Sequence, residues 1–423
     1  MCRLGIRWQS RDVRCRPLGN LVIGRSHLKR TLPVAAIFLA AGSLYAQFDF
    51  KVAGRNVQLH SFASQGFAYS NDNNYLTMNT SSGSFALTDA GANISVQVND
   101  KFRVGAQFYL RNVGNLGNFH PEVDWALGDY RFAPWFGIRV GKVKTTLGLY
   151  NDTQDLEFLH TWALLPQSAY PLDLRASTIA HTGGDFYGTI PVKKLGSLSY
   201  TMYGGSRIDD PRGGYYYGIK AVGAVAVNTN GNQIGGDLRW NTPLPGLLVG
   251  GSYLDSPLGA HITVEVAPTV VFPGSVSGAE RTTVFYGEYK TGGLTLAGEY
   301  RRERLFGMES VPGILGEHFA WDERGWWASG AYRFSKRLEL GSYYSRFFPS
   351  WADGDFDKPG NHLFDKTVTA RLDLTTHWDL KIEGHFLDGY GSPTSFRGFY
   401  PQDNPTGFKP KTTMFLVRTG WNF

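Results

Sequence analysis

Apolar and polar residues alternate strictly over many short stretches of this 423-residue chain. The clearest stretches cover 102–111, 294–301, 367–375 and 380–386. Because successive strand residues point to opposite faces, each stretch predicts a strand with one apolar and one polar face. After residue 47, no apolar run is long enough for a membrane-spanning helix, and helical periodicity is not sustained. The pattern therefore predicts an all-β protein.

The connections between these strands are alternately short and long, which favours a transmembrane antiparallel β-barrel over a soluble sandwich. Aromatic residues near strand ends, such as Tyr130, Phe334 and Trp378, are typical of the girdles of such barrels. An even number of strands places both chain ends at one rim, which we expect to be periplasmic. Sixteen strands are predicted, at 57–69, 84–98, 102–112, 122–132, 136–144, 180–190, 197–205, 232–241, 247–255, 281–290, 294–304, 325–335, 338–348, 366–376, 379–389 and 412–423.

Two further segments, 215–228 and 261–272, resemble strands but fall inside long connections. They extend neighbouring strands above the membrane, or they span it and raise the count to eighteen. The register of the other strands is fixed energetically. Slipping 366–376 by one residue would move Arg371 and Asp373 into lipid, where a cation at mid-bilayer costs about 2–4 kcal/mol.

Residues 28–46 have the pattern of a secretory signal peptide. Lys29 and Arg30 provide the basic start, an apolar core follows, and Ala46 is a small residue suited to cleavage after it. The alternative, a single membrane helix, needs about 20 apolar residues, and this run is shorter. The unusually long stretch 1–27 in front of it leaves the true start of translation open.

This leader changes the charge balance of the chain. The full sequence has 42 Lys and Arg against 36 Asp and Glu, a net charge of +6, which would suit a nucleic-acid or anionic surface. Without the signal peptide, 1–46, the expected mature domain, 47–423, has 34 cations against 35 carboxylates. Nucleic acid is therefore not an expected partner. Both cysteines, Cys2 and Cys15, lie in the leader, so no disulfide framework is predicted.

The chain ends on the strand KTTMFLVRTGWNF, in which one face is apolar or aromatic except for Thr419. The residues of that face are Phe415, Val417, Thr419, Trp421 and Phe423. This ending resembles the C-terminal signature of Gram-negative outer-membrane barrels. The resemblance implies an outer-membrane location, with outer-membrane lipid and the barrel-assembly machinery as partners.

Four runs between residues 55 and 190 carry a second resemblance: FASQGFAYSNDNNYL, PEVDWALGDYRF, FGIRVGKVKTTLGLYNDTQD and LLPQSAY. They look like a Gram-negative porin-like family related to the phosphate-selective porins. This chain has Thr146 and Leu147 where the family motif has Pro and an aromatic residue. The resemblance implies a porin for small hydrophilic solutes, assembled as a homotrimer.

Sixteen or eighteen strands leave an aqueous channel, whereas eight would be filled by side chains. The longest connection, 145–179, follows the fifth strand, and the resemblance implies that this third loop folds into the barrel and narrows it. Prolines 166 and 171 stiffen the segment. The candidate constriction residues are Lys144, Asp152, Asp155, Glu157, Asp173 and Arg175. No cofactor or metal is expected.

Alternation also assigns the residues that line the wall. The candidate cations are Arg103, Arg111, Arg139, Arg239, Arg301, Arg333, Arg371, Lys381 and Arg418. The candidate carboxylates are Asp237, Glu288, Glu299, Glu339, Asp373 and Glu383. Charges around a narrow pore set its ion selectivity, and the excess of cations favours a slight preference for anions. The plainer interpretation of any single charge is that it solvates the lumen or pairs with a neighbour.

Three other functions remain as alternatives. A barrel enzyme, such as a lipase or protease, would use a Ser/His or Asp/His pair, for which His385 beside Glu383 is the candidate. The chain has no G-x-S-x-G, H-E-x-x-H or P-loop motif. A second alternative is a hydrophobic-solute transporter or a plugged active transporter, and the early first strand leaves no room for a large N-terminal plug. A structural adhesin would have longer and more repetitive loops.

Overall fold

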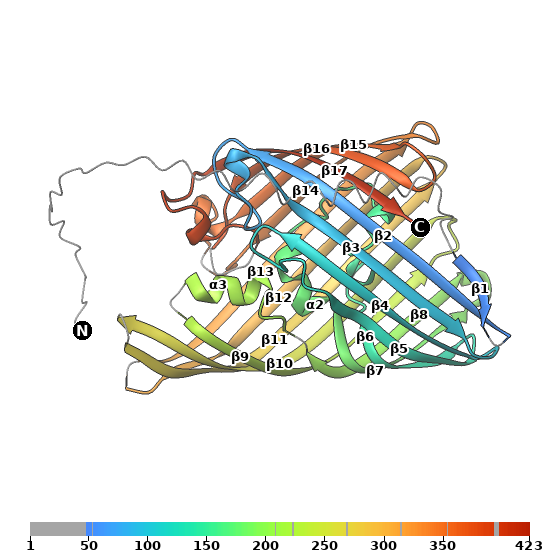
Figure 1. Cartoon of the computed structure of the whole chain (residues 1–423), viewed down its shortest axis with the longest axis horizontal. Helices are drawn as coiled ribbons and strands as arrows, with labels where there is room; N and C mark the ends of the chain where they lie inside the picture. The colour runs from blue at the N-terminus through green and yellow to red at the C-terminus, as the bar shows by residue number, and fades with distance from the viewer. Residues whose placement is uncertain are drawn as a thin grey trace. The chain divides into compact units, whose positions relative to one another are not determined.

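The computed structural model describes residues 48–52, 54–207, 209–221, 224–267, 270–313, 315–352, 354–392 and 397–423. The predicted signal peptide, 1–46, lies outside these residues. The described strands form one sheet in which every paired strand is antiparallel to its neighbour (Figure 1). Among the described residues, no helix is both long and apolar enough to cross a membrane.

Sixteen strands, β2 to β17, form the wall, and the ring closes where β17 pairs with β2. This confirms the predicted antiparallel barrel and its count of sixteen strands. The bounds are β2 Arg55–Ser70, β3 Ser84–Gln97, β4 Phe102–Val113, β5 Glu122–Ala133, β6 Phe136–Lys144, β7 Ala180–Pro191, β8 Ser197–Arg207, β9 Ala224–Asn241, β10 Leu247–Ala267, β11 Val270–Thr291, β12 Leu294–Val311, β13 Leu315–Arg333, β14 Leu338–Phe348, β15 Leu363–Asp373, β16 Trp378–Gly389 and β17 Lys411–Asn422.

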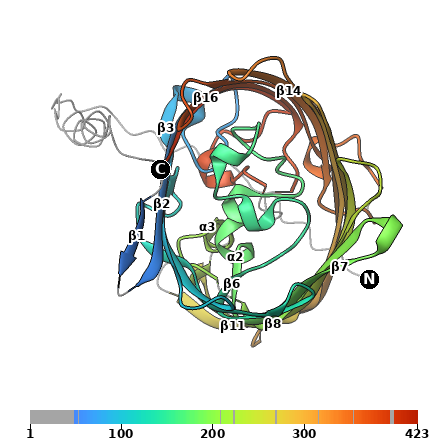
Figure 2. The same ribbon diagram turned by 90° about the vertical axis from the view of Figure 1, so that its right-hand side faces the viewer.

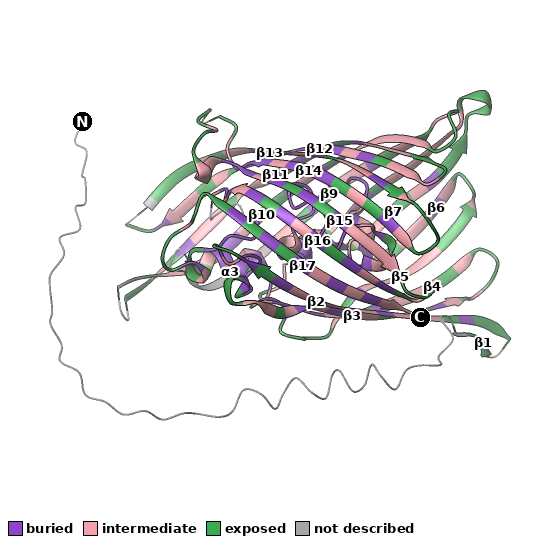
Figure 3. Cartoon of the chain, turned by 90° about the horizontal axis from the view of Figure 1, so that it is seen from above, coloured by how far each residue is buried: buried purple, intermediate pink, exposed green. Residues whose placement is uncertain are grey.

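Burial alternates along the strands as the sequence pattern requires (Figure 3). On β11, Phe285 is 60% exposed on the outer surface, whereas Val284 and Tyr286 on either side are 0% and 6% exposed. The outward residues form an apolar surface that suits lipid, and the inward residues are largely polar. Register is therefore set by burial, because an odd slip would exchange the two faces.

Strands β9 to β13 are longer than the others and extend past the barrel at the long-loop rim (Figure 1). Residues 261–267 pair along β10 with β11, where His261 lies opposite Ser275. The segment 261–272 therefore extends two existing strands, and the alternative of eighteen strands is wrong. The other strand-like segment, 215–228, divides between two elements. Residues 215–221 belong to the helix α3, Gly214–Ala221, whereas residues 224–228 extend β9, where Asn228 lies opposite His261.

The remaining helices are single turns in loops or at strand ends. Their bounds are η1 Thr80–Ser82, η2 Asn151–Thr153, η3 Glu157–Leu159, η4 Leu172–Leu174, α2 Arg175–Thr178, η5 Lys193–Leu195, η6 Pro359–Asn361 and η7 Pro401–Asp403.

A short strand, β1 Phe48–Val52, pairs with the first residues of β2. Its partners on β2 are residues 55–59, and β17 pairs with β2 from Phe62 onward. The backbone of Phe423 exchanges two hydrogen bonds with Ser61, with N–O distances of 2.8 and 2.6 Å. Since β3 occupies the other edge of β2, β1 and β17 follow one another along the same edge.

Candidate pore and its constriction loop

The third loop, 145–179, lies inside the barrel (Figure 2). Its apolar side chains, including Leu147, Trp162 and Tyr170, are buried against the inward aromatic residues Trp327 and Tyr343 of the wall. This packing confirms that the loop folds inward.

Glycines let the loop approach the wall closely. Gly148 has a φ of +70°, and a Cβ at this position would lie 2.7 Å from Oε2 of Glu299. On the wall, a Cβ at Gly341 would lie 2.8 Å from the indole of Trp162. A side chain at either position would push the loop away from the strands behind it.

Charged side chains of β16 and β17 hold the middle of the loop. The carboxylate of Glu383 accepts hydrogen bonds from the backbone N–H groups of Ala163 and Leu164, at 2.7 and 3.1 Å. Arg418 donates to the carbonyl of Ala163 at 2.7 Å. Lys381, which is fully buried, pairs with the carboxylate of Glu157 and donates to its carbonyl at 2.6 Å.

Glu299 binds the start of the loop. It accepts the N–H of Leu149 at 3.1 Å and the hydroxyl of Tyr170 at 2.5 Å. Three arginines of the wall each donate to a loop carbonyl: Arg239 to Gly148 at 2.9 Å, Arg301 to Ala169 at 3.2 Å and Arg371 to His160 at 2.7 Å. These wall charges therefore hydrogen-bond the loop backbone, which the sequence alone does not reveal.

An ion-pair cluster fixes the two ends of the loop. Lys144 lies 2.6 Å from Asp155, and Arg175 lies 2.7 Å from Asp124 on β5. Gln107 donates to both carboxylates, at 2.7 Å to Asp155 and 3.0 Å to Asp124. Burial alone would raise the pKa of Asp155, but Lys144 and Arg175 bring that pKa below its ordinary value.

The far end of the loop contacts segments at the long-loop rim. Asp173 accepts hydrogen bonds from the hydroxyl of Tyr400 at 2.7 Å and from the N–H of Gly398 at 2.9 Å. Burial raises the pKa of Asp173 above its ordinary value, although these hydrogen bonds oppose the rise. Arg111 donates to the carbonyl of Leu172 at 3.1 Å.

Loops from both halves of the chain pack together at this rim. Tyr75, Phe399 and Phe347 share a buried apolar cluster with Leu164 of the third loop. The hydroxyl of Tyr217 on α3 donates to Asp403 at 2.6 Å. The long-loop end of the lumen is therefore covered by several ordered segments besides the third loop.

The remaining predicted wall residues form ion pairs with one another or with acids outside the predicted set. Arg103 lies 3.4 Å from Asp129, and Arg139 lies 2.8 Å from Asp185. Arg333 pairs with both Glu339 and Asp373, and the latter also binds Arg371 at 2.8 Å. Two predicted acids contact the third loop less directly: Glu288 accepts the Tyr150 hydroxyl at 3.2 Å, and Asp237 pairs with Arg239 at 3.0 Å. Asp152 is half-buried, and its carbonyl accepts a hydrogen bond from Lys144 at 3.0 Å.

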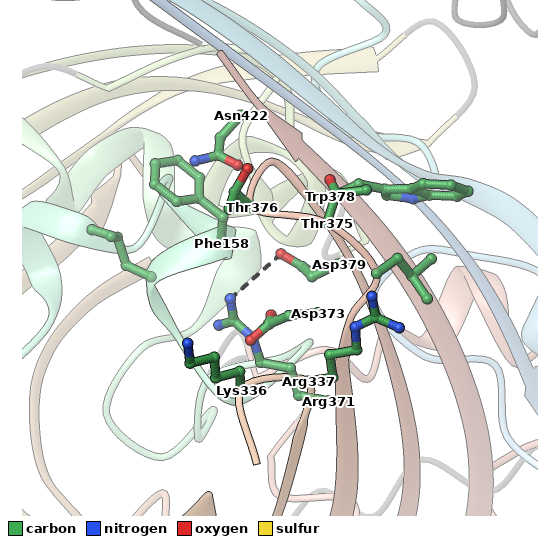
Figure 4. A pocket seen from close by; sticks show the side chains of 12 residues that line it. Phe158, Lys336, Arg337, Arg371, Asp373, Thr375, Thr376, Trp378, Asp379 and Asn422 are labelled. Carbon is green, nitrogen blue, oxygen red and sulfur yellow. Dashed lines mark hydrogen bonds and ion pairs between the residues drawn. The ribbon is translucent and has the colours of Figure 1, made fainter. Parts of the chain in front are cut away.

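A cavity of about 670 Å³ lies at the short-turn rim (Figure 4). Phe158 and Leu159 of the third loop line it together with strands β15 to β17. Its charged residues are Lys336, Arg337, Arg371, Asp373 and Asp379, and Arg371 lies 3.7 Å from Asp379. The third loop thus forms one wall of a polar vestibule.

His160 is a titratable group held inside the loop. Its Nε2 lies 3.0 Å from the carbonyl oxygen of Thr153, and its ring packs edge-on against Tyr150. Burial lowers the pKa of His160 from 6.5 to about 4, although the Thr153 carbonyl opposes this shift.

Acid is therefore expected to loosen the third loop between about pH 6.5 and pH 4. A released loop binds a proton at His160 that the docked loop does not, so the docked state loses up to about 3 kcal/mol as the pH falls through this window. Single-channel recordings from pH 7 to pH 4 should show growing current noise. His160→Gln should abolish this change, and an unchanged pH profile in the variant would contradict the assignment.

His385, the candidate of the enzyme alternative, is buried between two carboxylates. Its Nδ1 lies 2.9 Å from Asp365 and its Nε2 lies 3.2 Å from Glu383. Since Glu383 holds Ala163 and Leu164, the histidine lies behind the docked loop and orients one of its anchors.

Asp129 and Asp185, which pair with Arg103 and Arg139, were not among the predicted residues, and neither were two further acids. Asp89 on β3 binds Arg418 at 2.6 Å, and Asp124 binds Arg175. Both occupy inward positions of predicted strands, so the alternation could have included them. Asp173 reaches Tyr400 from 227 residues away, and no local pattern signals such a contact.

Comparisons with known proteins identify the fold. No protein-family model and no curated protein sequence matches the chain. Outer-membrane expressed OmpT of Vibrio cholerae is 12% identical with a TM-score of 0.55, covering 89% of this chain and 100% of that one. OmpF of Salmonella typhi, solved with daunomycin, is 12% identical with a TM-score of 0.54, over 89% and 100%. An anion-selective porin from Comamonas acidovorans is 13% identical with a TM-score of 0.52, over 87% and 100%. The chain therefore has the fold of bacterial outer-membrane β-barrels.

Proposed function

We propose that this protein is an outer-membrane porin, a channel for passive diffusion of small hydrophilic solutes and ions. The observation that carries the proposal is a closed sixteen-strand barrel whose lumen holds a loop tied to a charged wall. Sixteen strands enclose enough space for water. The tethered loop narrows this lumen but does not fill it as a separate plug domain would. The shared fold with OmpF and with an anion-selective porin supports this function.

The location and assembly belong to the same proposal. Export through the signal peptide, 1–46, would place the short turns and both ends of 47–423 on the periplasmic side. The C-terminal strand suits recognition by the barrel-assembly machinery: Phe415 is exposed on the lipid face, and Trp421 stacks on Trp378. Assembly as a homotrimer follows from the family resemblance.

A channel explains the buried histidine better than catalysis does. His385 is 1% exposed and its two ring nitrogens face Asp365 and Glu383. A substrate would have to displace the third loop to reach it. We therefore assign these groups to holding the loop in a non-enzymatic channel.

Planar-bilayer recording of the refolded protein tests the function. Stepwise conductance is expected, and its absence from correctly folded protein would overturn the porin proposal. In a salt gradient, the reversal potential should show a slight preference for anions, because Lys336, Arg337 and Arg371 face the vestibule against Asp373 and Asp379. A cation-selective reversal potential would contradict this part of the proposal.

A further inference from the structure

A row of cations crosses the outer surface of β11 to β15 near the long-loop rim. We name it the outer basic band, and its members are Arg281, Arg302, Arg304, Arg324, Arg346 and Lys366. The register aligns them: Arg281 lies opposite Arg304, and Arg302 lies opposite Arg324. Arg346 and Lys366 lie opposite the aromatic residues Trp326 and Tyr344. Five neighbouring strands thus present basic side chains at one level.

These side chains face outward, away from the pore. They share strand parity with lipid-facing residues such as Phe285, Leu296 and Val368, which are 60%, 44% and 53% exposed. Their sequence neighbours of opposite parity, such as Thr282, Arg301 and Asp365, are buried toward the lumen. The outer basic band therefore has no part in lining the channel.

The charge of the band is not balanced by nearby acids. Asp322 pairs with both Arg302 and Arg324, at 2.7 and 2.9 Å, and Asp255 pairs with Arg281 at 3.0 Å. Within the described ranges, Arg304, Arg346 and Lys366 have no carboxylate within ion-pair distance. Asp388 on the adjoining strand β16 lies opposite Phe364 and is half-exposed, and its ion-pair partner is His362 rather than a member of the band. Six cations therefore face three carboxylates among the described residues of this surface.

In the outer basic band, the guanidinium of Arg346 is held in place by neighbouring aromatic rings. Its guanidinium lies 4.1 Å from the ring centre of Phe364 and 5.1 Å from that of Phe348. Its Nε is buried and has no hydrogen-bond partner among the described residues. The aromatic rings hold the planar group in place, and no hydrogen bond or ion pair among the described residues engages its two terminal Nη groups. Arginine binds phosphate through paired N–H groups of this kind.

The level of the band indicates which anion it meets. Directly below it, the same outward faces carry Tyr300, Trp326 and Tyr344, followed by aliphatic side chains. From Tyr332 to Arg324, β13 advances about 27 Å at 3.4 Å per residue. With the usual barrel tilt this gives a height of about 20 Å, close to that of an apolar belt. The band therefore lies where hydrocarbon gives way to headgroups.

We propose that the outer basic band binds the phosphate groups of lipid headgroups in the outer leaflet, with the acyl chains packed on the aromatic residues below. The proposal rests on the barrel lying in an outer membrane and does not require that it conducts solutes. Charge complementarity selects a phosphorylated lipid, and the adjoining apolar belt selects a lipid over a soluble anion.

Native mass spectrometry of the full-length folded protein tests this binding. The probes are dioleoyl phosphatidic acid, which has a phosphomonoester headgroup, and dioleoyl phosphatidylcholine, which is neutral overall. Phosphatidic acid should be retained at least about ten-fold more than phosphatidylcholine, because clustered basic residues attract anionic headgroups. Equal retention of the two lipids would overturn the proposal, and so would displacement of phosphatidic acid by an equal concentration of inorganic phosphate.

Substitution locates the site. The triple variant R304Q/R346Q/K366Q removes the three unbalanced cations and should lose the preference for phosphatidic acid. The matched control K101Q/K193Q/K194Q removes three cations at the short-turn rim and should keep it. Loss in both variants would show unspecific attraction and overturn the proposal. A changed oligomeric state with lipid retention unchanged would assign the band to contact between copies and overturn it as well.

The same preparations separate this proposal from the proposed channel. The triple variant should keep its heat-modifiable mobility, which shows that it is folded, and its single-channel conductance, because the band faces away from the lumen. A protein that conducts nothing but still selects phosphatidic acid would overturn the porin function and support the lipid site.

Discussion

Deleting Leu149–Arg175 is expected to raise the single-channel conductance at least about two-fold, because a sixteen-strand barrel without an internal loop encloses a wider aqueous pore. The deletion is compatible with the fold. Lys144 and Ala180 are paired residues of β6 and β7, so the residues left, 145–148 and 176–179, can close a hairpin. Planar-bilayer recording at fixed salt measures the change.

A matched control shortens a loop outside the lumen. Ile262 and Gly274 are paired at the projecting end of β10 and β11, and removing 262–274 should leave conductance unchanged. Equal conductance in wild type and in the third-loop deletion would show that the covered long-loop rim limits the current instead. The alternative constriction would then lie among the segments around Tyr400 and Tyr217.

Replacing Lys381 by methionine is expected to destabilise the docked third loop by about 3–5 kcal/mol, because the buried carboxylate of Glu157 loses its ion-pair partner. Both side chains of this pair are buried in wild type. The temperature at which a protease begins to cleave the third loop of folded protein should fall. Current noise in bilayers should increase in parallel.

The double variant K381M/E157Q provides the control, because it also removes the Glu157 carboxylate that K381M leaves buried without an ion-pair partner. It should recover most of the lost stability, and failure to recover it would show that Lys381 acts through packing alone. Burial tends to raise the pKa of Glu157, but Lys381 brings it below its ordinary value of 4.5. The pair therefore stabilises the docked loop above about pH 4.5, and this contribution is lost as the pH falls through the lowered pKa. Wild type and K381M should converge in strong acid.

The barrel wall could be predicted from the sequence because its signal is local and repeated. Every strand has a period of two, and a displaced charge such as Arg371 would enter lipid, so both the strands and their inward faces follow from short windows. The same windows mislead at 215–221. The run YYYGIKA suits a strand by composition, yet it forms α3, where Tyr217 contacts Asp403.

The partners of the lumen charges could not be predicted in the same way. Parity shows that Glu383 and Arg418 point inward, but it does not show what stands opposite them. Their partners are backbone groups of Ala163, about 220 residues or more away in the sequence. Backbone groups carry no residue-specific signal, so nothing in the sequence indicates that these charges bind the loop instead of water.

The short strand β1 blocks movement of β17 along β2 in one direction at the seam where the barrel closes. Alternation of faces forbids β17 to slide along β2 by one residue but not by two, because an even slip keeps every apolar side chain in lipid. On β2, residues 55–59, on the N-terminal side of Ser61, are already paired with β1, where Phe48 lies opposite Leu59. A slip of β17 toward the short-turn rim would have to expel β1 from that edge. The strand β1 thus fixes the position on β2 at which β17, the last strand, ends.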